Sequence, residues 1–184
     1  WIIGDEVLVP MPDYPLWTAA VSLAGGNAVH YVCDEEAEWY PDIDDIKSKI
    51  TSNTKAIVVI NPNNPTGELL PMSYVEAVLQ ASENPVVVDE AYLEFSGVPS
   101  IITKLSQYDN LIVIRTLSKA FGLAGCRVGY GVAQKEVIDA LSLTKLVYNL
   151  NVLSQNAALS ALEYADETLG SQHPADAGGP RRFL

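Results

Sequence analysis

The sequence predicts an α/β fold built on a parallel sheet, and three segments of one plan carry that prediction. Each begins with a short run of apolar, mostly β-branched residues and ends abruptly in a polar loop: KAIVVINPNNPTG, NPVVVDEAYLEF and NLIVIRTLSKAFGL. Because the apolar runs are continuous rather than alternating, they are typical of strands covered on both faces. Helical spacing lies between them, so strand and helix alternate along the chain.

Helical spacing and turn residues locate the other elements. Helices are predicted over 73–81 and 101–105, and a longer helical stretch is predicted over 135–167 with an interruption near 149–151. Asp42 is a candidate N-cap for another helix with an isoleucine face: Ile43, Ile46 and Ile50. The segment GDEVLVPMPDY reads as a turn, a strand and a loop, and two further segments read as strands: NAVHYVC and RVGYGVA. The glycines of the last one suggest a close approach of backbone or ligand.

The size and charge of the chain favour one acidic domain. Its 184 residues are 48% apolar and carry a formal net charge of −12. Nucleic-acid-binding surfaces need concentrated Lys and Arg, so no nucleic-acid partner is expected. Cys33 and Cys126 form no CxxC pair, which fits a reducing cytoplasm better than secretion. No apolar run approaches the roughly 18 residues of a membrane span, so we expect no membrane partner.

Three polar loops should meet at one edge of the predicted sheet, because the carboxyl ends of parallel strands open into one crevice. They would bring together a carboxylate, a phenol, hydroxyls, amides and cations: Asn64, Asp89, Tyr92, Thr116, Ser118 and Lys119, with Arg127 a short way further on.

The chemistry of this set points to pyridoxal phosphate. A lysine at a helix start, near another cation and away from water, would be partly neutral, which is the form that attacks a carbonyl. Lys119 is therefore a candidate Schiff-base lysine. The hydroxyls of Thr116 and Ser118, with Arg127, resemble a phosphate pocket to which helix amides would add their dipole.

The remaining groups suit the ring of the same cofactor. Asp89 would supply the counter-charge for a protonated ring nitrogen. Asn64 and Tyr92 would supply hydrogen bonds to a ring oxygen. No metal is expected, because His30 and His173 lie far apart in the sequence and His30, inside a strand, is interpreted as structural.

Three separated motifs, in this order and spacing, resemble those of the fold-type I pyridoxal-phosphate-dependent aminotransferases: NPNNPTG, VVVDEAYLEFSG and TLSKAFGLAGCRVGYG. The resemblance extends over about residues 1–165. It implies a three-layer α/β sandwich with a mostly parallel, mixed sheet, pyridoxal 5′-phosphate as cofactor and a homodimer. It also implies transfer of an amino group between an amino acid and a 2-oxo acid.

The resemblance assigns a role to each candidate residue. It implies that Lys119 holds the cofactor as a Schiff base, that Asp89 pairs with the pyridine nitrogen, and that Asn64 and Tyr92 hold the phenolic oxygen. The phosphate would be held by side chains near Lys119: Ser118 and Arg127, with Thr116 as a helper. The early PDY segment is similar to the one whose aromatic ring stacks on the cofactor, which nominates Tyr14.

Two subfamilies share the resemblance. From about Gly67 onward the motifs are similar to histidinol-phosphate aminotransferases. The earlier segment, PDYPLWTAAVSLAGGNAVHYVCDEEAEWYPDIDDI, is similar to bacterial alanine aminotransferases. The amino donor therefore stays open between an amino acid and histidinol phosphate.

Each feature also has a purely structural interpretation. An NPNNP loop can simply end a strand, because proline extends its predecessor and asparagine tolerates turns. Asp89 and Glu90 can begin a solvated helix, and Tyr92 can be a core residue. Lys119 can be a surface lysine, Arg127 a salt-bridge partner and Tyr14 a packing residue. The agreement of all the motifs on one cofactor favours the functional interpretation.

The ends of the sequence indicate part of a longer protein. The chain begins without Met at Trp1, and its tail SQHPADAGGPRRFL has no amphipathic period. We expect an incomplete cofactor-binding large domain over 1–168 and an irregular tail over 169–184. The family's glycine-rich phosphate segment and its small domain are not visible, and Arg181 and Arg182 carry no family resemblance. A truncated, non-catalytic cofactor-binding domain, or a decarboxylase or lyase of the same fold, are therefore the alternatives to a transaminase.

Overall fold

One mixed sheet organises the computed structural model, which describes residues 4–165 and 169. The strand order is β3-β2-β1-β4-β5-β6-β7. The bounds are β1 Glu6–Met11, β2 Asn27–Asp34, β3 Tyr40–Pro41, β4 Thr54–Ile60, β5 Val86–Asp89, β6 Leu111–Thr116 and β7 Gly129–Ala133. The strands from β2 to β6 pair in parallel, whereas β3 and β7 run antiparallel to their neighbours. The predicted parallel sheet is thus confirmed.

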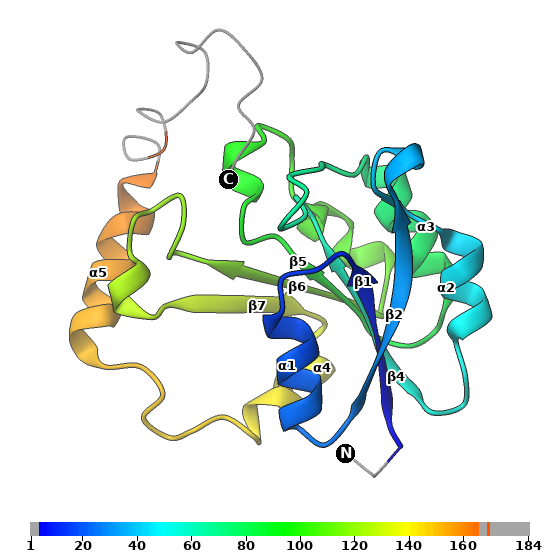
Figure 1. Ribbon diagram of the computed structural model, residues 1–184. Coiled ribbons are helices and arrows are strands. Elements are labelled where there is room, and N and C mark those ends of the chain that lie inside the picture. Colours follow the sequence, from blue (N-terminus) through cyan, green and yellow to red (C-terminus); the bar gives the residue numbers. More distant parts are fainter. Residues whose placement is uncertain (1–3, 166–168, 170–184) are drawn as a thin grey trace, which may run out of the picture.

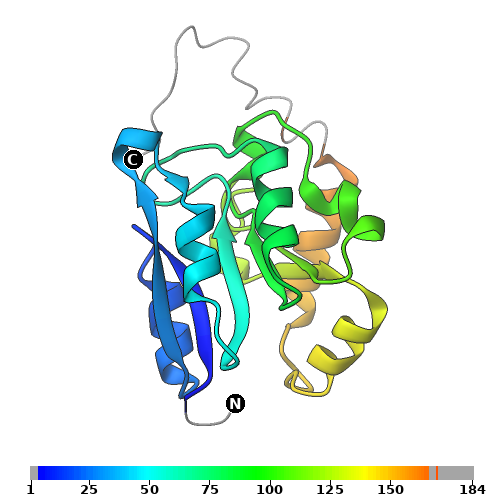
Figure 2. The same cartoon turned by 90° about the vertical axis from the view of Figure 1, so that its right-hand side faces the viewer.

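Helices cover both faces of this sheet (Figures 1 and 2). The α-helices are α1 Leu16–Leu23, α2 Ile43–Lys49, α3 Met72–Ala81, α4 Lys135–Ser142 and α5 Val152–Glu163. Short 3-10 turns lie between them: η1 Glu35–Ala37, η2 Leu93–Phe95, η3 Ile101–Gln107 and η4 Ala124–Cys126. In Figure 2, α2 and α3 lie in front of the strands and α1 behind them. The chain therefore has the three layers that the resemblance implied.

Two apolar clusters separate the layers. The larger one joins β-strand residues such as Val88 to Ile46 of α2 and Val78 of α3. The smaller one joins residues of the other sheet face to Val21 of α1, with Trp17 packed against it. Successive residues of β5 point to opposite clusters, which explains why its sequence is apolar without alternation.

Local signals fix several boundaries as predicted. The Asp42 carboxylate caps α2 by accepting from the amides of Asp44 and Asp45. The helix predicted over 73–81 is α3. The one predicted over 101–105 is the 3-10 helix η3, whose cap is the Ser100 hydroxyl.

The long helical stretch predicted over 135–167 is interrupted more widely than expected. It forms α4 and α5, with non-helical residues 143–151 between them. Asn151 begins α5, because its side chain accepts from the amide of Ser154. The end of the predicted helix, after residue 165, and the predicted tail over 169–184, apart from residue 169, lie outside the described residues.

Candidate active site

The carboxyl ends of β4, β5 and β6 meet at one edge of the sheet. Asp89, the last residue of β5, pairs in register with Ile60 of β4 and Ile114 of β6. The amide of Asn61 donates to the carbonyl of Asp89 at 2.9 Å, which ties the first polar loop to the second. Three segments that are distant in the sequence therefore begin side by side, as the strand pattern predicted.

Asp89 is held by two donors in a largely buried position. Trp17 Nε1 donates to its Oδ2 at 3.0 Å, and the Ala91 amide donates to its Oδ1 at 3.0 Å. Burial raises the pKa of Asp89, while the Trp17 bond, the Ala91 bond and the charge of Lys119 act in the opposite direction. The carboxylate is thus desolvated but supplied with hydrogen bonds, which suits a counter-charge for a cationic ring nitrogen.

Asn64, Tyr92 and Lys119 come together from the three loops. Asn64 Nδ2 donates to the phenol oxygen of Tyr92 at 3.2 Å. Lys119 Nζ lies 5.0 Å from the centroid of the Tyr92 ring, over its face. The amide, the phenol and the amine therefore share one small region next to Asp89, whose carboxylate feels the charge of Lys119.

The NPNNPTG loop uses its other asparagines to fix its own path. Asn61 is buried, and its side chain both accepts from the Leu70 amide and donates to the Leu70 carbonyl. Asn63 Oδ1 accepts from the amide and the hydroxyl of Thr66. Gly67 closes the turn at φ +76°, a left-handed conformation that favours glycine. Asn64 is thereby presented to Tyr92 by a loop with a fixed backbone.

The candidate phosphate ligands follow β6, but no helix begins there. Residues 118–121 form bends and a turn, and the next helical element is η4. The expectation that Lys119 opens a helix, and that helix amides add to the phosphate pocket, is wrong. The Gly122 amide donates to the Lys119 carbonyl at a positive φ, which turns the chain instead. Lys119 is also exposed, so the expected shielding of its amine from water is not found.

Thr116, Ser118 and Arg127 surround this turn. The Thr116 hydroxyl accepts from the Ser118 amide at 3.1 Å and donates to the Val128 carbonyl at 3.4 Å. Arg127 is exposed, has a left-handed φ of 55°, and donates from Nη1 to the Ala124 carbonyl. Thr116 thus shapes the backbone of the turn, which fits its assignment as a helper.

Tyr14 lies in the turn that leads into α1. Its carbonyl accepts from the Trp17 amide at 3.2 Å, and its side chain is 52% exposed. The same turn therefore carries the candidate stacking ring and the indole that binds Asp89. The sequence reasoning missed Trp17. Its position three residues after Tyr14 was no more than a hint, because the bond to Asp89 depends on how α1 lies on the sheet.

The interpretation of Asp89 and Glu90 as a solvated helix start is wrong. Glu90 is only 2% exposed, and η2 begins after Tyr92. The interpretation of His30 as structural agrees with its bond to the Thr18 hydroxyl at 2.9 Å. Within residues 4–165, no group of three or more His, Cys, Asp or Glu side chains is placed to hold a metal ion. The described helices include none long and apolar enough to cross a membrane.

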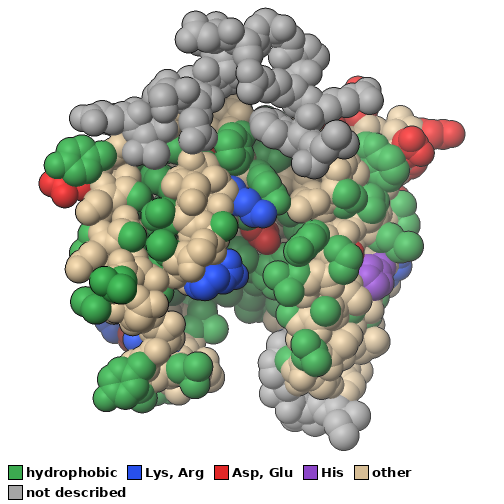
Figure 3. Space-filling model, turned by 60° about the vertical axis from the view of Figure 1, so that its left-hand side comes forward, with side chains coloured by type: hydrophobic (Ala, Val, Ile, Leu, Met, Phe, Trp, Pro, Cys, Tyr) green, Lys and Arg blue, Asp and Glu red, His purple; other side chains and the backbone are tan. Residues whose placement is uncertain are grey.

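One face of the molecule is hollowed. Figure 3 shows a hollow between two halves of this face, with Lys or Arg side chains and an acidic side chain at its wall. A cavity of about 370 Å³ lies between the first loop and the η2 segment. Its lining includes Asn64, Tyr92 and Phe95. Asn64 and Tyr92 therefore border open space large enough for a small molecule, whereas Lys119 and Asp89 are not among the residues that line it.

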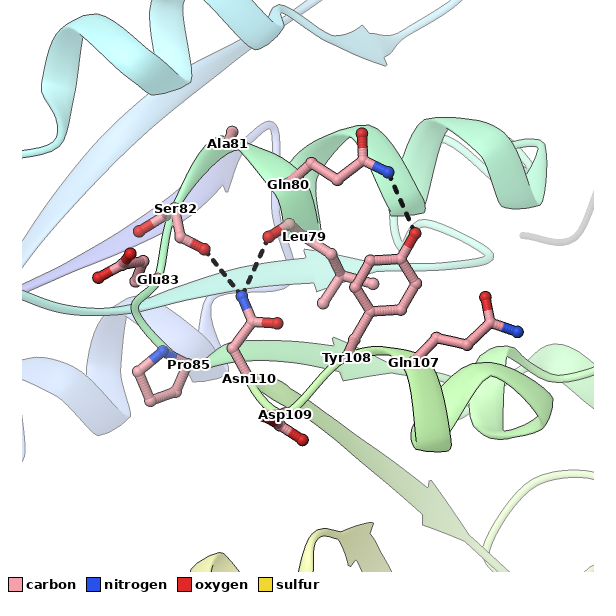
Figure 4. Close-up of a pocket in the computed structure, with 10 residues that line it drawn as sticks. All are labelled: Leu79, Gln80, Ala81, Ser82, Glu83, Pro85, Gln107, Tyr108, Asp109 and Asn110. Atoms are coloured by element: carbon pink, nitrogen blue, oxygen red, sulfur yellow. Dashed lines mark hydrogen bonds between the residues drawn. The ribbon is translucent and has the colours of Figure 1, made fainter.

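A second depression, of about 600 Å³, lies at the opposite ends of the strands. Figure 4 shows Asn110 at its centre, where the side-chain amide donates to the carbonyls of Leu79 and Ser82. Gln80 donates to the Tyr108 hydroxyl at 3.2 Å at the other side. The two Asn110 bonds satisfy carbonyls at the end of α3, so this side chain caps the helix.

Comparisons with known proteins agree with the motifs. The family model described as aminotransferase class I and II matches residues 2–174. A glutamate-pyruvate aminotransferase of Haemophilus influenzae is 45% identical over 172 residues, covering 86% of this chain and 43% of that protein. A histidinol-phosphate aminotransferase of Ruminiclostridium cellulolyticum is 42% identical over 166 residues, covering 89% of this chain and 46% of that protein. Relatives of both expected kinds are thus found.

Solved structures give the same result. An aspartate aminotransferase double mutant of Thermus thermophilus superposes with a TM-score of 0.86 at 29% identity, covering 95% of this chain and 48% of that one. An alanine aminotransferase of Pyrococcus furiosus superposes with a TM-score of 0.79 at 38% identity, covering 94% of this chain and 47% of that one. The chain spans less than half the length of these curated relatives and structures.

Proposed function

Because the chain belongs to the class I and II aminotransferase family, which generally depends on pyridoxal phosphate, we propose that it forms the cofactor-binding part of a transaminase. The reaction would transfer an amino group between an amino acid, or histidinol phosphate, and a 2-oxo acid. The observation that carries the proposal is the meeting of Asn64, Tyr92 and Lys119 beside Asp89.

The donor set fits this cofactor. A partly buried carboxylate that already accepts two hydrogen bonds suits a cationic ring nitrogen, and a paired amide and phenol suit an anionic ring oxygen. Pyridoxal phosphate, when bound, supplies an electron sink that stabilises negative charge at the substrate Cα. Ser118 and Arg127, with Thr116 behind them, would hold its phosphate, and the Tyr14 ring would stack on it.

Lys119 has two tasks in this proposal. Its Nζ would hold the cofactor covalently until a substrate amine displaces it. The freed amine would then carry a proton from the substrate Cα to the cofactor carbon, acting as base and afterwards as acid. The ring of Tyr92 beneath Nζ would favour its cationic form after it takes the proton.

The extent of the domain and its assembly belong to the same proposal. Residues 1–168 would form the large, cofactor-binding domain, and the chain would act in a homodimer. The relatives named for alanine and histidinol phosphate differ in their donors, so the donor of this chain is a matter for assay.

The experiment has two stages. Purified chain is mixed with pyridoxal phosphate, and the absorbance band is compared between wild type and Lys119→Ala. Borohydride reduction followed by peptide mass analysis then locates the cofactor. We expect a band and a mass increase at Lys119 that are lost in Lys119→Ala but retained in Lys145→Ala, a matched exposed lysine. A band independent of Lys119 would overturn the cofactor assignment.

The second stage adds alanine, glutamate or histidinol phosphate. Conversion of the band to that of the aminated cofactor, together with release of the 2-oxo product, would support transamination. A Lys119-dependent band that no donor converts would instead support a non-catalytic cofactor-binding domain. Release of carbon dioxide or of an elimination product would point to a decarboxylase or lyase.

A further inference from the structure

A buried ion cluster lies behind the candidate site. Arg115, on β6, extends its guanidinium between two glutamates: Nη2 lies 2.7 Å from Glu94 Oε1 and Nη1 lies 3.6 Å from Glu90 Oε2. The three side chains are 14%, 8% and 2% exposed, in the order Arg115, Glu94 and Glu90. None of them belongs to the set assigned to the cofactor.

Glu90 fastens the two ends of one loop. Its Oε2 accepts from the Ser100 hydroxyl at 2.6 Å, and its Oε1 accepts from the Ile101 amide at 2.9 Å. Its own amide donates to the carbonyl of Ile114 on β6 at 3.0 Å. The segment from Glu90 to Ile101 is thus closed at its base and attached to the sheet.

Glu94 fastens the middle of the same loop. It lies in η2, two residues after Tyr92, and its bond to Arg115 crosses from the loop to β6. Tyr92 therefore lies between two glutamates that share one guanidinium. Because Arg115 is also on the strand that leads into Lys119, the cluster joins the loop that carries the phenol to the strand that carries the amine.

The cluster is poorly suited to a purely stabilising role. Buried charges lose hydration, and well-packed apolar side chains often replace them without loss of stability. Here Arg115 Nε and Glu94 Oε2 are buried without a hydrogen-bond partner, so the hydration loss is incompletely offset. An arrangement of this kind is better explained by the geometry that it imposes than by stability.

We propose that Arg115 and Glu94 are positioning residues that aim the Tyr92 phenol at Asn64 and hold its ring under Lys119. The inference rests on the proposed function for the identity of the ring oxygen that Tyr92 contacts. Loss of the Arg115–Glu94 bond releases η2, lengthens the Asn64–Tyr92 contact and moves the ring away from Nζ.

The consequence can be measured on the bound cofactor. A phenol that donates to the ring oxygen draws electron density from it, and so lowers its attraction for the proton on the Lys119 nitrogen. In Glu94→Gln, which keeps the shape and removes the charge, the pH midpoint of the absorbance change of Lys119-bound cofactor rises by about half a unit or more. Arg115→Met gives a shift in the same direction.

A double-variant comparison separates positioning from general destabilisation. Tyr92→Phe alone raises the midpoint, and adding Glu94→Gln to it produces no further shift, because the group through which Glu94 acts is gone. Glu76→Gln is the matched control, because Glu76 of α3 pairs with Lys104 of η3 at 3.0 Å and neither residue belongs to the segment from Glu90 to Ile101. It leaves the midpoint at the wild-type value. An unchanged midpoint in Glu94→Gln, or an equal shift with and without the Tyr92 hydroxyl, overturns the inference.

A second measurement needs no cofactor. Hydrogen exchange of the cofactor-free chain should be faster at the amides of Phe95 and Ser96 in Glu94→Gln, because the attachment of η2 to Arg115 loses its ionic character and weakens, and unchanged in Glu76→Gln. Equal exchange in wild type and Glu94→Gln would also contradict the inference. If exchange accelerates but no Lys119-dependent band forms in wild type, the positioning of η2 by Arg115 and Glu94 stands and the proposed function fails.

Discussion

Trp17 Nε1 donates to Asp89 Oδ2 at 3.0 Å, across 72 positions of the sequence. The bond joins α1 to the last residue of β5. Indole nitrogen is a donor that never accepts, so this partner favours the ionised form of the carboxylate at all pH values. Burial, the larger effect, raises the pKa of Asp89, and the Trp17 bond acts against that rise.

Replacing Trp17 by Phe should weaken cofactor binding by about tenfold to a hundredfold, which corresponds to the loss of one hydrogen bond to a buried charge. The pKa of Asp89 should rise further, so binding should fall off at a higher pH on acidification than in wild type. Fluorescence titration with pyridoxal phosphate from pH 5 to pH 8 measures both effects. Trp39→Phe removes an indole elsewhere and should bind as wild type does. Identical affinity in both variants would refute a role for the bond.

Replacing Asp89 by Asn should stabilise the cofactor-free chain at neutral pH while abolishing cofactor binding. Burial raises the pKa of Asp89 above its ordinary 3.8, so the folded state holds this proton more tightly than the unfolded state. As pH rises from the pKa of Asp89 in the unfolded state to its higher pKa in the folded state, the chain therefore loses stability. Above the folded-state pKa this loss is complete. The Asp89→Asn variant does not lose this stability, because an asparagine side chain does not ionise.

Thermal or urea unfolding across pH 3 to 8 tests the sign. The difference between Asp89→Asn and wild type should shrink as the pH falls toward 3.8 and remain constant near neutrality. Asp139→Asn, at a side chain that is 61% exposed, should show no comparable pH-dependent gain. A variant less stable than wild type at every pH would disprove the argument.

Gly129 and Gly131 on β7 form a matched pair for a steric prediction. A Cβ on Gly129 would lie 2.9 Å from the Arg115 carbonyl oxygen, whereas a Cβ on Gly131 would lie 3.9 Å from the Val113 oxygen. Gly129→Ala should therefore destabilise the fold by about 1–3 kcal/mol, because backbone has to move. Gly131→Ala should cost clearly less in the same denaturant titration. Equal losses of stability in the two variants would contradict the prediction, because they would mean that the β6 backbone at Arg115 shifts at little cost.

The two cysteines should differ sharply in reactivity. Burial raises the pKa of the Cys33 thiol to about 11, so almost none of it is thiolate at pH 8. Cys126 is partly exposed in η4. Titration of the folded chain with an aromatic disulfide at pH 8 should modify Cys126 quickly and Cys33 only on unfolding. Cys33→Ser and Cys126→Ser variants identify which thiol reacts, and rapid loss of the Cys33 thiol would contradict its burial.

Sequence reasoning succeeded where local chemistry and one general rule were enough. Asn64 and Lys119 follow apolar strands and Asp89 ends one, so the parallel-sheet rule alone predicts their meeting. It failed for Trp17, because the bond to Asp89 depends on how α1 lies on the sheet, which no local pattern encodes. It also failed for the surroundings of Lys119, where a turn at Gly122 stands in place of the expected helix start.

The Glu90–Glu94–Arg115 cluster was hidden for a different reason. Charged residues that follow a strand are usually solvated, and Glu90 and Glu94 are spaced like an ordinary helical face. Only the register of β5 with β6 reveals that Arg115 lies within reach of both. Ion pairs between residues of different strands and loops can be recognised only once the order and register of the strands are known.

The NPNNPTG loop separates its building residues from its reactive one. Asn61 binds the Leu70 backbone and Asn63 binds Thr66, while Asn64 reaches across to Tyr92. A change at position 64 could therefore alter the electronic tuning of the site without disturbing the backbone. Position 64 is a place where a lineage, or a protein engineer, can vary chemistry independently of folding.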